Sequence, residues 1–68
     1  MKEGNTMRAD RLIMIILLLQ THKSITAKTL AEKLEVSERT IYRDIDILSS
    51  LGVPLYTDRG RYGSIKLD

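Results

Sequence analysis

An unbroken run of eight apolar residues, Leu12 to Leu19, most limits how this chain can fold. Periodicity alone does not separate a buried helix from a buried strand in such a run. The run with its flanks is longer than a typical strand, and no Gly or Pro interrupts it, so we expect a helix from Met7 or Arg8 to Gln20. A helix that is apolar on nearly every side must be covered on nearly every side. A chain of 68 residues can cover only part of it, so the remainder is predicted to meet a second copy or a neighbouring domain.

The same run is too short to be a membrane span. A helix needs about 20 apolar residues to cross a bilayer. Arg8 and Arg11 precede the run as cations precede the core of a signal peptide, but Asp10 lies between them and no small-residue cleavage site follows. We therefore expect no membrane partner and a cytoplasmic, nucleoid-associated location.

The composition excludes several kinds of chemistry. The chain has no Cys, which excludes disulfides, thiolate nucleophiles and zinc fingers. His22 is the single histidine and is expected to be an exposed loop residue, so no His cluster for a metal can form. No convergent set of acid, base and nucleophile is visible. The sequence predicts neither an enzyme nor a cofactor or metal site.

Two amphipathic segments follow a polar break at residues 21–24. Thr26 is a good N-cap, and apolar residues from Ala27 to Leu34 recur at the i, i+3, i+4, i+7 spacing of a short helix. Ser37 is a second N-cap candidate, and it precedes a helix predicted over residues 38–51. The buried stripe of that helix is expected to consist of Ile41, Ile45 and Leu48. Gly52 stands where a C-terminal glycine cap belongs.

The last residues change character from helical to extended. Residues 53–57 can form a short extended segment, and Pro54 places it near the edge of a sheet. Residues 58–64 are rich in Gly and charge, and residues 65–67 alternate as a strand does. We therefore predict a mainly α fold with a small β part, a winged helix-turn-helix of three helices and a C-terminal hairpin wing. It would span residues 8–67, behind a disordered N-terminus at residues 1–7.

Three sequence segments carry a resemblance to a known family. They are LAEKLEVSERTIYRDI, LGVPLY and GRYGSIKL, in that order. Over roughly residues 8–67 the chain resembles the winged helix-turn-helix of DeoR-like and WYL-domain bacterial transcription regulators. The resemblance implies duplex DNA as partner and, in a full-length protein, a C-terminal effector-sensing domain. Glu35 replaces a frequent Gly in the turn, so we expect it to adopt a left-handed conformation, and Gly63-Ser64 replaces a frequent Gly-Gly in the wing.

The residues of the predicted third helix support DNA binding independently of the resemblance. Arg39 and Arg43 lie one turn apart, opposite the apolar stripe. Arginine pairs bidentately with guanine, and Thr40 can contact a base edge or a thymine methyl. The hydroxyls of Ser37 and Tyr42 suit phosphate oxygens.

Further candidate contacts lie on two other elements. Thr26 and Lys28, at the start of the second helix, can hold a phosphate beside the free N–H groups there. Three cations surround an aromatic residue in the hairpin, and the resemblance implies that this wing reaches the minor groove or a flanking phosphate. These wing residues are Arg59, Arg61, Tyr62 and Lys66.

Several of these residues also have purely structural interpretations. Arg39 and Arg43 can form a solvated face with Glu35 and Glu38. Ser37 caps its helix in any case, and Tyr42 can pack its ring on the first helix. Other residues are expected to have structural roles alone. Asp44 is expected to pair with Arg8 or Arg11, whereas Tyr56, Met7 and Met14 are expected in the core.

Three function classes fit this pattern. The first is sequence-specific binding of duplex DNA by a transcription regulator, and the others are a protein-binding and an RNA-binding winged helix. A net charge of only +2 does not itself indicate nucleic acid, but the placement of the cations does. RNA readers stack bases on exposed aromatics, and only Tyr42 and Tyr62 are available, so duplex DNA is favoured. Surplus apolar surface, with Ile47 and Leu55, makes a homodimer through helix 8–20 a further expectation.

Overall fold

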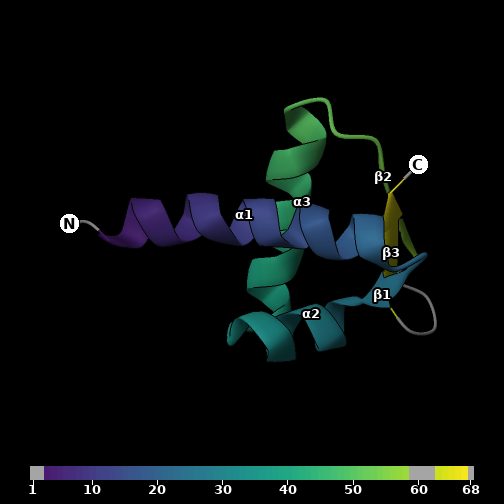
Figure 1. Ribbon diagram of the computed structural model, residues 1–68, viewed down its shortest axis with the longest axis horizontal. Coiled ribbons are helices and arrows are strands. Elements are labelled where there is room, and N and C mark those ends of the chain that lie inside the picture. Colours follow the sequence, from purple (N-terminus) through teal and green to yellow (C-terminus); the bar gives the residue numbers. More distant parts are fainter. Residues whose placement is uncertain (1–2, 59–62, 68) are drawn as a thin grey trace.

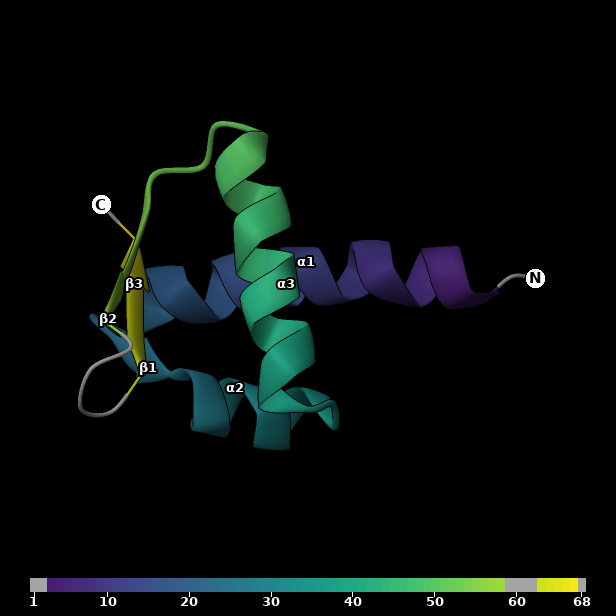
Figure 2. The ribbon, with the colours of Figure 1, turned by 180° about the vertical axis from the view of Figure 1, so that it is seen from behind.

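The computed structural model describes residues 3–58 and 63–67 of the chain. Its helices and strands follow one another as α1 (Glu3–Thr21), β1 (Ile25–Thr26), α2 (Ala27–Leu34), α3 (Glu38–Ser50), β2 (Leu55–Asp58) and β3 (Ser64–Leu67). Figure 1 shows α1 lying across the middle of α3, with α2 below it and the strands gathered at the C-terminal end of α1. The same arrangement is visible from behind, where α3 lies in front of α1 (Figure 2).

The first helix starts earlier than the sequence pattern predicts. It begins at Glu3, four residues before the earlier of the two expected starts, Met7 and Arg8. Gly4 costs a helix only about 1 kcal/mol relative to Ala, and no Pro is present to stop the helix. Extending a helix that has already formed requires no new nucleation, so the apolar run can carry these residues with it.

The apolar run of α1 is buried along one side. Ile15 and Leu19, four residues apart, are among the most buried side chains, whereas Ile13, Met14 and Leu17 are 56%, 44% and 49% exposed. The expectation that Met14 lies in the core is therefore wrong. Successive residues of a helix are rotated by about 100° around its axis, so the apolar run points in every direction. The rest of the domain covers the side that carries Ile15 and Leu19 and leaves the opposite side exposed.

Both predicted N-caps are present. The Thr26 hydroxyl accepts a hydrogen bond from the backbone N–H of Thr29 at 3.0 Å. The Ser37 hydroxyl accepts one from the backbone N–H of Thr40 at 3.1 Å. Each cap satisfies one of the N–H groups that the first turn of a helix leaves without an intrahelical partner.

The turn between α2 and α3 contains the left-handed residue expected from the sequence. Glu35 has φ 59°, and its N–H donates to the carbonyl oxygen of Ala31. The N–H of Val36 donates to the same oxygen at 3.0 Å. At the end of α3, Gly52 has φ 98° and its N–H donates to Ser49 O at 3.0 Å, which confirms the glycine cap.

The strands form an antiparallel sheet with β3 in the centre, in the order β1-β3-β2. The predicted hairpin is present as the β2–β3 pair, with Leu55 opposite Leu67. The sequence pattern does not predict β1, in which Ile25 pairs with Ile65. Two residues are too few to show the alternation that identifies a strand, so only the tertiary fold makes this pairing visible.

The expected burial of Tyr56 is wrong. Tyr56 is 55% exposed and lies opposite Lys66 in the β2–β3 ladder. Side chains alternate between the two faces of a strand, and the partly buried Leu55 packs against the core. Its neighbour Tyr56 therefore faces the opposite side.

One hydrophobic core joins all three helices to the sheet. Its buried apolar members are Ile15, Leu19, Ile25, Ala27, Leu30, Ala31, Ile41, Ile45, Leu48 and Ile65. Three helices followed by a β-hairpin confirm the predicted winged helix-turn-helix fold. In the part of the chain that the structure describes, no helix is long and apolar enough to span a membrane.

Candidate nucleic-acid interface

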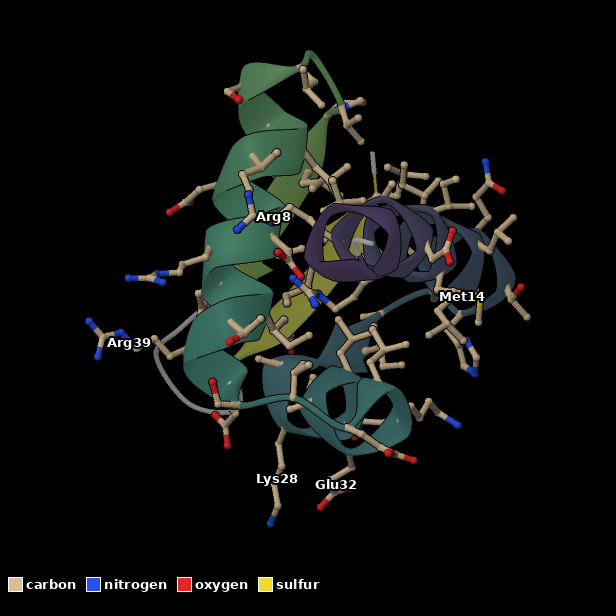
Figure 3. The ribbon with its side chains drawn as sticks, turned by 90° about the vertical axis from the view of Figure 1, so that its left-hand side faces the viewer. Arg8, Met14, Lys28, Glu32 and Arg39 are labelled. Atoms are coloured by element: carbon tan, nitrogen blue, oxygen red, sulfur yellow. The ribbon has the colours of Figure 1, made fainter. Side chains whose placement is uncertain are left out.

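The outward side of α3 presents two arginines. Arg39 and Arg43 are exposed, whereas Ile41 and Ile45 are buried in the core. Residues four apart lie on one side of a helix, so burial of the isoleucines turns both guanidinium groups outward. Figure 3 shows Arg39 extending away from α1. The structure thus brings these two predicted contacts together on one free helix face.

The hydroxyls at the start of α3 are arranged by the cap. The Ser37 hydroxyl accepts the backbone N–H of Thr40 and donates to Thr40 Oγ1 at 3.1 Å. A hydroxyl that accepts a hydrogen bond keeps its own proton as a donor. Thr40 therefore has a proton to offer beside Arg39, while Ser37 is used in capping.

The start of α2 repeats this arrangement. Thr26 caps the helix and donates to Thr29 Oγ1 at 2.8 Å. Lys28 is exposed and extends away from the core, and Glu32 extends to the same side of α2 (Figure 3). Thr29 is not among the residues predicted from the sequence. Its hydroxyl accepts a hydrogen bond from Thr26, as that of Thr40 does from Ser37.

Asp44 follows Arg43 but does not share its exposure. It is 1% exposed and accepts two hydrogen bonds from Arg11 of α1, one of them from Nη2 at 3.1 Å. The expected pairing of Asp44 with Arg8 or Arg11 is thus confirmed for Arg11. The hydrogen bond to Asp44 raises the pKa of the Arg11 guanidinium, and burial opposes the shift. This pair keeps one negative charge of α3 away from the outward face.

Tyr42 reaches the beginning of β3. A Cβ atom placed on Gly63 would lie 2.6 Å from Tyr42 Oη, so the phenol hydroxyl occupies the space where a side chain would begin. The carbonyl oxygen of Gly63 accepts the backbone N–H of Ala27 at 2.9 Å. Residues of α2 and α3 therefore meet the residue that directly precedes β3. Nothing in the sequence spacing indicates this contact, because the residues lie far apart along the chain.

Lys66 is the wing cation that the structure describes, and it is exposed on β3. The other predicted wing contacts lie outside the described residues; they are Arg59, Arg61 and Tyr62. Among the described residues, no group of three or more His, Cys, Asp or Glu side chains could hold a metal ion.

Comparison with known proteins is consistent with this geometry. The model of the HTH domain family matches residues 11–65. The chain is 44% identical over 59 residues to YobV of Bacillus subtilis (strain 168), described as an uncharacterized HTH-type transcriptional regulator. The match covers 87% of this chain and 19% of YobV, so the chain spans about a fifth of the length of that relative. No solved structure matches the chain.

Proposed function

The chain belongs to the HTH domain family, and we propose on that basis that it binds duplex DNA sequence-specifically as part of a bacterial transcription regulator. The observation that carries the proposal is the exposure of Arg39 and Arg43 on the side of α3 opposite the core. An exposed helix of this kind fits the major groove, which admits one α-helix. The DeoR-like or WYL-domain type remains part of the proposal and rests on the sequence resemblance.

Arg39, Thr40 and Arg43 would read bases. Each guanidinium can donate two parallel hydrogen bonds to a guanine, and the Thr40 hydroxyl has a proton to donate to a base edge or a phosphate. Only the first turns of α3 would enter the groove, because Asp46 is exposed in its second half and would repel phosphates.

A second set of residues would hold the DNA backbone. Lys28 and Lys66 are exposed cations on α2 and β3, and their charges favour phosphates irrespective of sequence. Thr26 and Ser37 would add hydrogen bonds at the two helix starts. From the sequence alone we add three wing residues and one from α3 to the proposed contacts: Arg59, Arg61, Tyr62 and Tyr42.

We also propose a homodimer through α1. Ile13, Met14 and Leu17 are exposed there. Met14 also lines a groove together with Leu34 and Val36. A second copy would cover this apolar surface. The effector-sensing domain of a full-length protein rests on the sequence resemblance to DeoR-like and WYL-domain regulators.

Selection of bound sequences from a random pool of duplex DNA would test the proposal. Enrichment of one motif is expected, because bidentate arginine contacts favour particular bases by about 1–3 kcal/mol each. The variants Arg39→Ala and Arg43→Ala should lose binding to that motif while keeping the circular-dichroism spectrum and melting temperature of the parent.

Arg8→Ala is the charge-matched control, since Arg8 is an exposed arginine on α1. It should bind the selected motif nearly as well as the parent does. Normal binding by both α3 variants would contradict the groove assignment. Recovery of no DNA at all would favour a protein or RNA partner instead.

A further inference from the structure

Gly63 occupies a constrained position at the base of the wing. Its φ is +62°, a conformation that L side chains rarely adopt. Its carbonyl oxygen accepts the backbone N–H of Ala27, and the next residue, Ser64, pairs with Thr26 in the β1–β3 ladder. The end of the wing loop is therefore fixed against the start of α2.

The hydroxyl of Tyr42 lies close to where the Cβ of a larger residue at position 63 would be. A Cβ on Gly63 would meet Tyr42 Oη at 2.6 Å, whereas the next atom, Ala27 Cβ, would be at an ordinary 3.8 Å. The Tyr42 ring is half-buried and packs against the hydrophobic core. Tyr42 is thus held in place by its ring and contacts the wing with its hydroxyl end.

Both partners of this contact adjoin proposed DNA-binding residues. In the sequence of α3, Tyr42 directly precedes Arg43 and follows Arg39 by three residues. Gly63 directly follows residues 59–62, which connect β2 to β3. A shift at this contact would turn the wing relative to α3. We propose that Tyr42 is a positioning residue whose contact with Gly63 sets the orientation of the wing on the DNA, an inference that rests on the proposed DNA-binding function.

Gly63→Ala tests this contact, and the chain provides a matched control. Gly52 also has a positive φ, +98°, but a Cβ there would meet nothing within 4 Å. Both alanine variants strain the backbone, and only Gly63→Ala also displaces Tyr42. On a mixed-sequence duplex we expect Gly63→Ala to weaken binding about tenfold and Gly52→Ala by less than about twofold.

Tyr42→Phe separates positioning from direct contact with DNA. It removes the oxygen that the added Cβ would meet, so Gly63→Ala should cost only about threefold in the Tyr42→Phe background. The Gly52→Ala effect should be the same in both backgrounds. If Tyr42 acted only by contacting DNA, Gly63→Ala would instead cost the same in both backgrounds.

Measurements without DNA keep this inference separate from the proposed function. Nuclear Overhauser contacts between the Tyr42 ring protons and the Gly63 α-protons are expected in the free protein, and their absence would overturn the inference. Failure of the parent to bind any duplex would refute the DNA-binding proposal instead. Parent-like binding by folded Gly63→Ala, or equal losses in both Tyr42 backgrounds, would also overturn the positioning role.

If Gly63→Ala does not fold, Gly63→Asn provides the same test. Asparagine tolerates a positive φ better than alanine and brings the same Cβ toward Tyr42 Oη. Its loss of affinity should likewise be reduced by Tyr42→Phe, and an undiminished loss would count against the positioning role.

Discussion

At the scale of single residues, Asp44 places a negative charge inside an otherwise apolar core. Its carboxylate accepts two hydrogen bonds from Arg11, whose side chain is 17% exposed. An unpaired buried charge is much less stable than a paired one. The pair therefore favours the observed packing of α1 against α3, because a packing that separated Asp44 from Arg11 would break both hydrogen bonds.

We expect Asp44→Ala to lower the free energy of unfolding by about 3 kcal/mol, since it leaves the Arg11 charge without its partner. The double variant Arg11→Met/Asp44→Leu should lose less, because it removes both charges. Asp46→Ala, two residues away and exposed, should change the free energy by less than about 0.5 kcal/mol. Urea unfolding measures all three, and equal stabilities of Asp44→Ala and Asp46→Ala would contradict the structural role.

The pH dependence of this pair has a definite sign. The pKa of Arg11 is raised in the fold by its hydrogen bond to Asp44. A raised pKa in a basic group gives stability that is fully present below the unfolded-state pKa and is lost only as pH rises through the folded-state value. The Arg11 contribution is therefore constant through the neutral range.

At the scale of elements, the turn between α2 and α3 holds a residue in an unfavourable conformation. Glu35 has φ 59° and is exposed, and its backbone N–H closes the end of α2 on Ala31 O. A left-handed conformation costs a residue with a Cβ roughly 1–2 kcal/mol, and glycine does not pay this cost. Replacing Glu35 with glycine would remove this cost, but glycine has more conformational freedom in the unfolded chain, which offsets part of the gain in stability.

Glu35→Gly is therefore expected to raise the free energy of unfolding by about 0.5 kcal/mol. Glu38→Gly serves as the contrast, because Glu38 is the first residue of α3 and glycine is a poor helix former there. Thermal unfolding followed by circular dichroism should show opposite shifts in melting temperature. A lower melting temperature for Glu35→Gly would show that its side chain stabilises the turn in some other way.

The strands depend more on tertiary contacts than the helices do. The spacing of apolar residues and the caps predicted α2 at its observed bounds and α3 to within one residue at its C-terminal end. β1 has two residues and exists only because Ile25 lies opposite Ile65. The start of α1 at Glu3 likewise reflects extension of an existing helix more than the preferences of its first residues.

At the scale of the whole molecule, the distribution of charge decides the expected interaction with DNA. The net charge is only +2, so attraction must come from cations gathered on one side. Each phosphate neutralised contributes about −0.9 to the slope of log K against log salt. With several cations on α2, α3 and the wing, we expect a slope of about −3 to −5.

Lys28→Ala and Lys66→Ala should each reduce the magnitude of that slope by about one, with little change in preferred sequence. Lys33→Ala is the control, because Lys33 is exposed at the opposite end of α2. Fluorescence anisotropy over a range of salt concentrations measures the slopes. A flat titration for the parent would indicate that the surface serves a protein partner.

The exposed apolar face of α1 predicts self-association. Ile13, Met14 and Leu17 would be removed from water by a second copy. Leu17→Glu should shift the chain toward monomer in sedimentation equilibrium and keep the circular-dichroism spectrum of the parent, because Leu17 is about half exposed in the single chain. A monomeric parent at high concentration would contradict dimerisation by this chain alone.

The sequence by itself determined the second and third helices, the two N-caps, the glycine cap and the outward pair Arg39 and Arg43. These depend on residues within a few positions of one another, so local spacing is sufficient to predict them. The contacts of Tyr42 with Gly63, Arg11 with Asp44 and Ile25 with Ile65 were decided or specified by the tertiary structure. They join residues far apart in the chain, and no local period encodes which distant side chain will fill a given space.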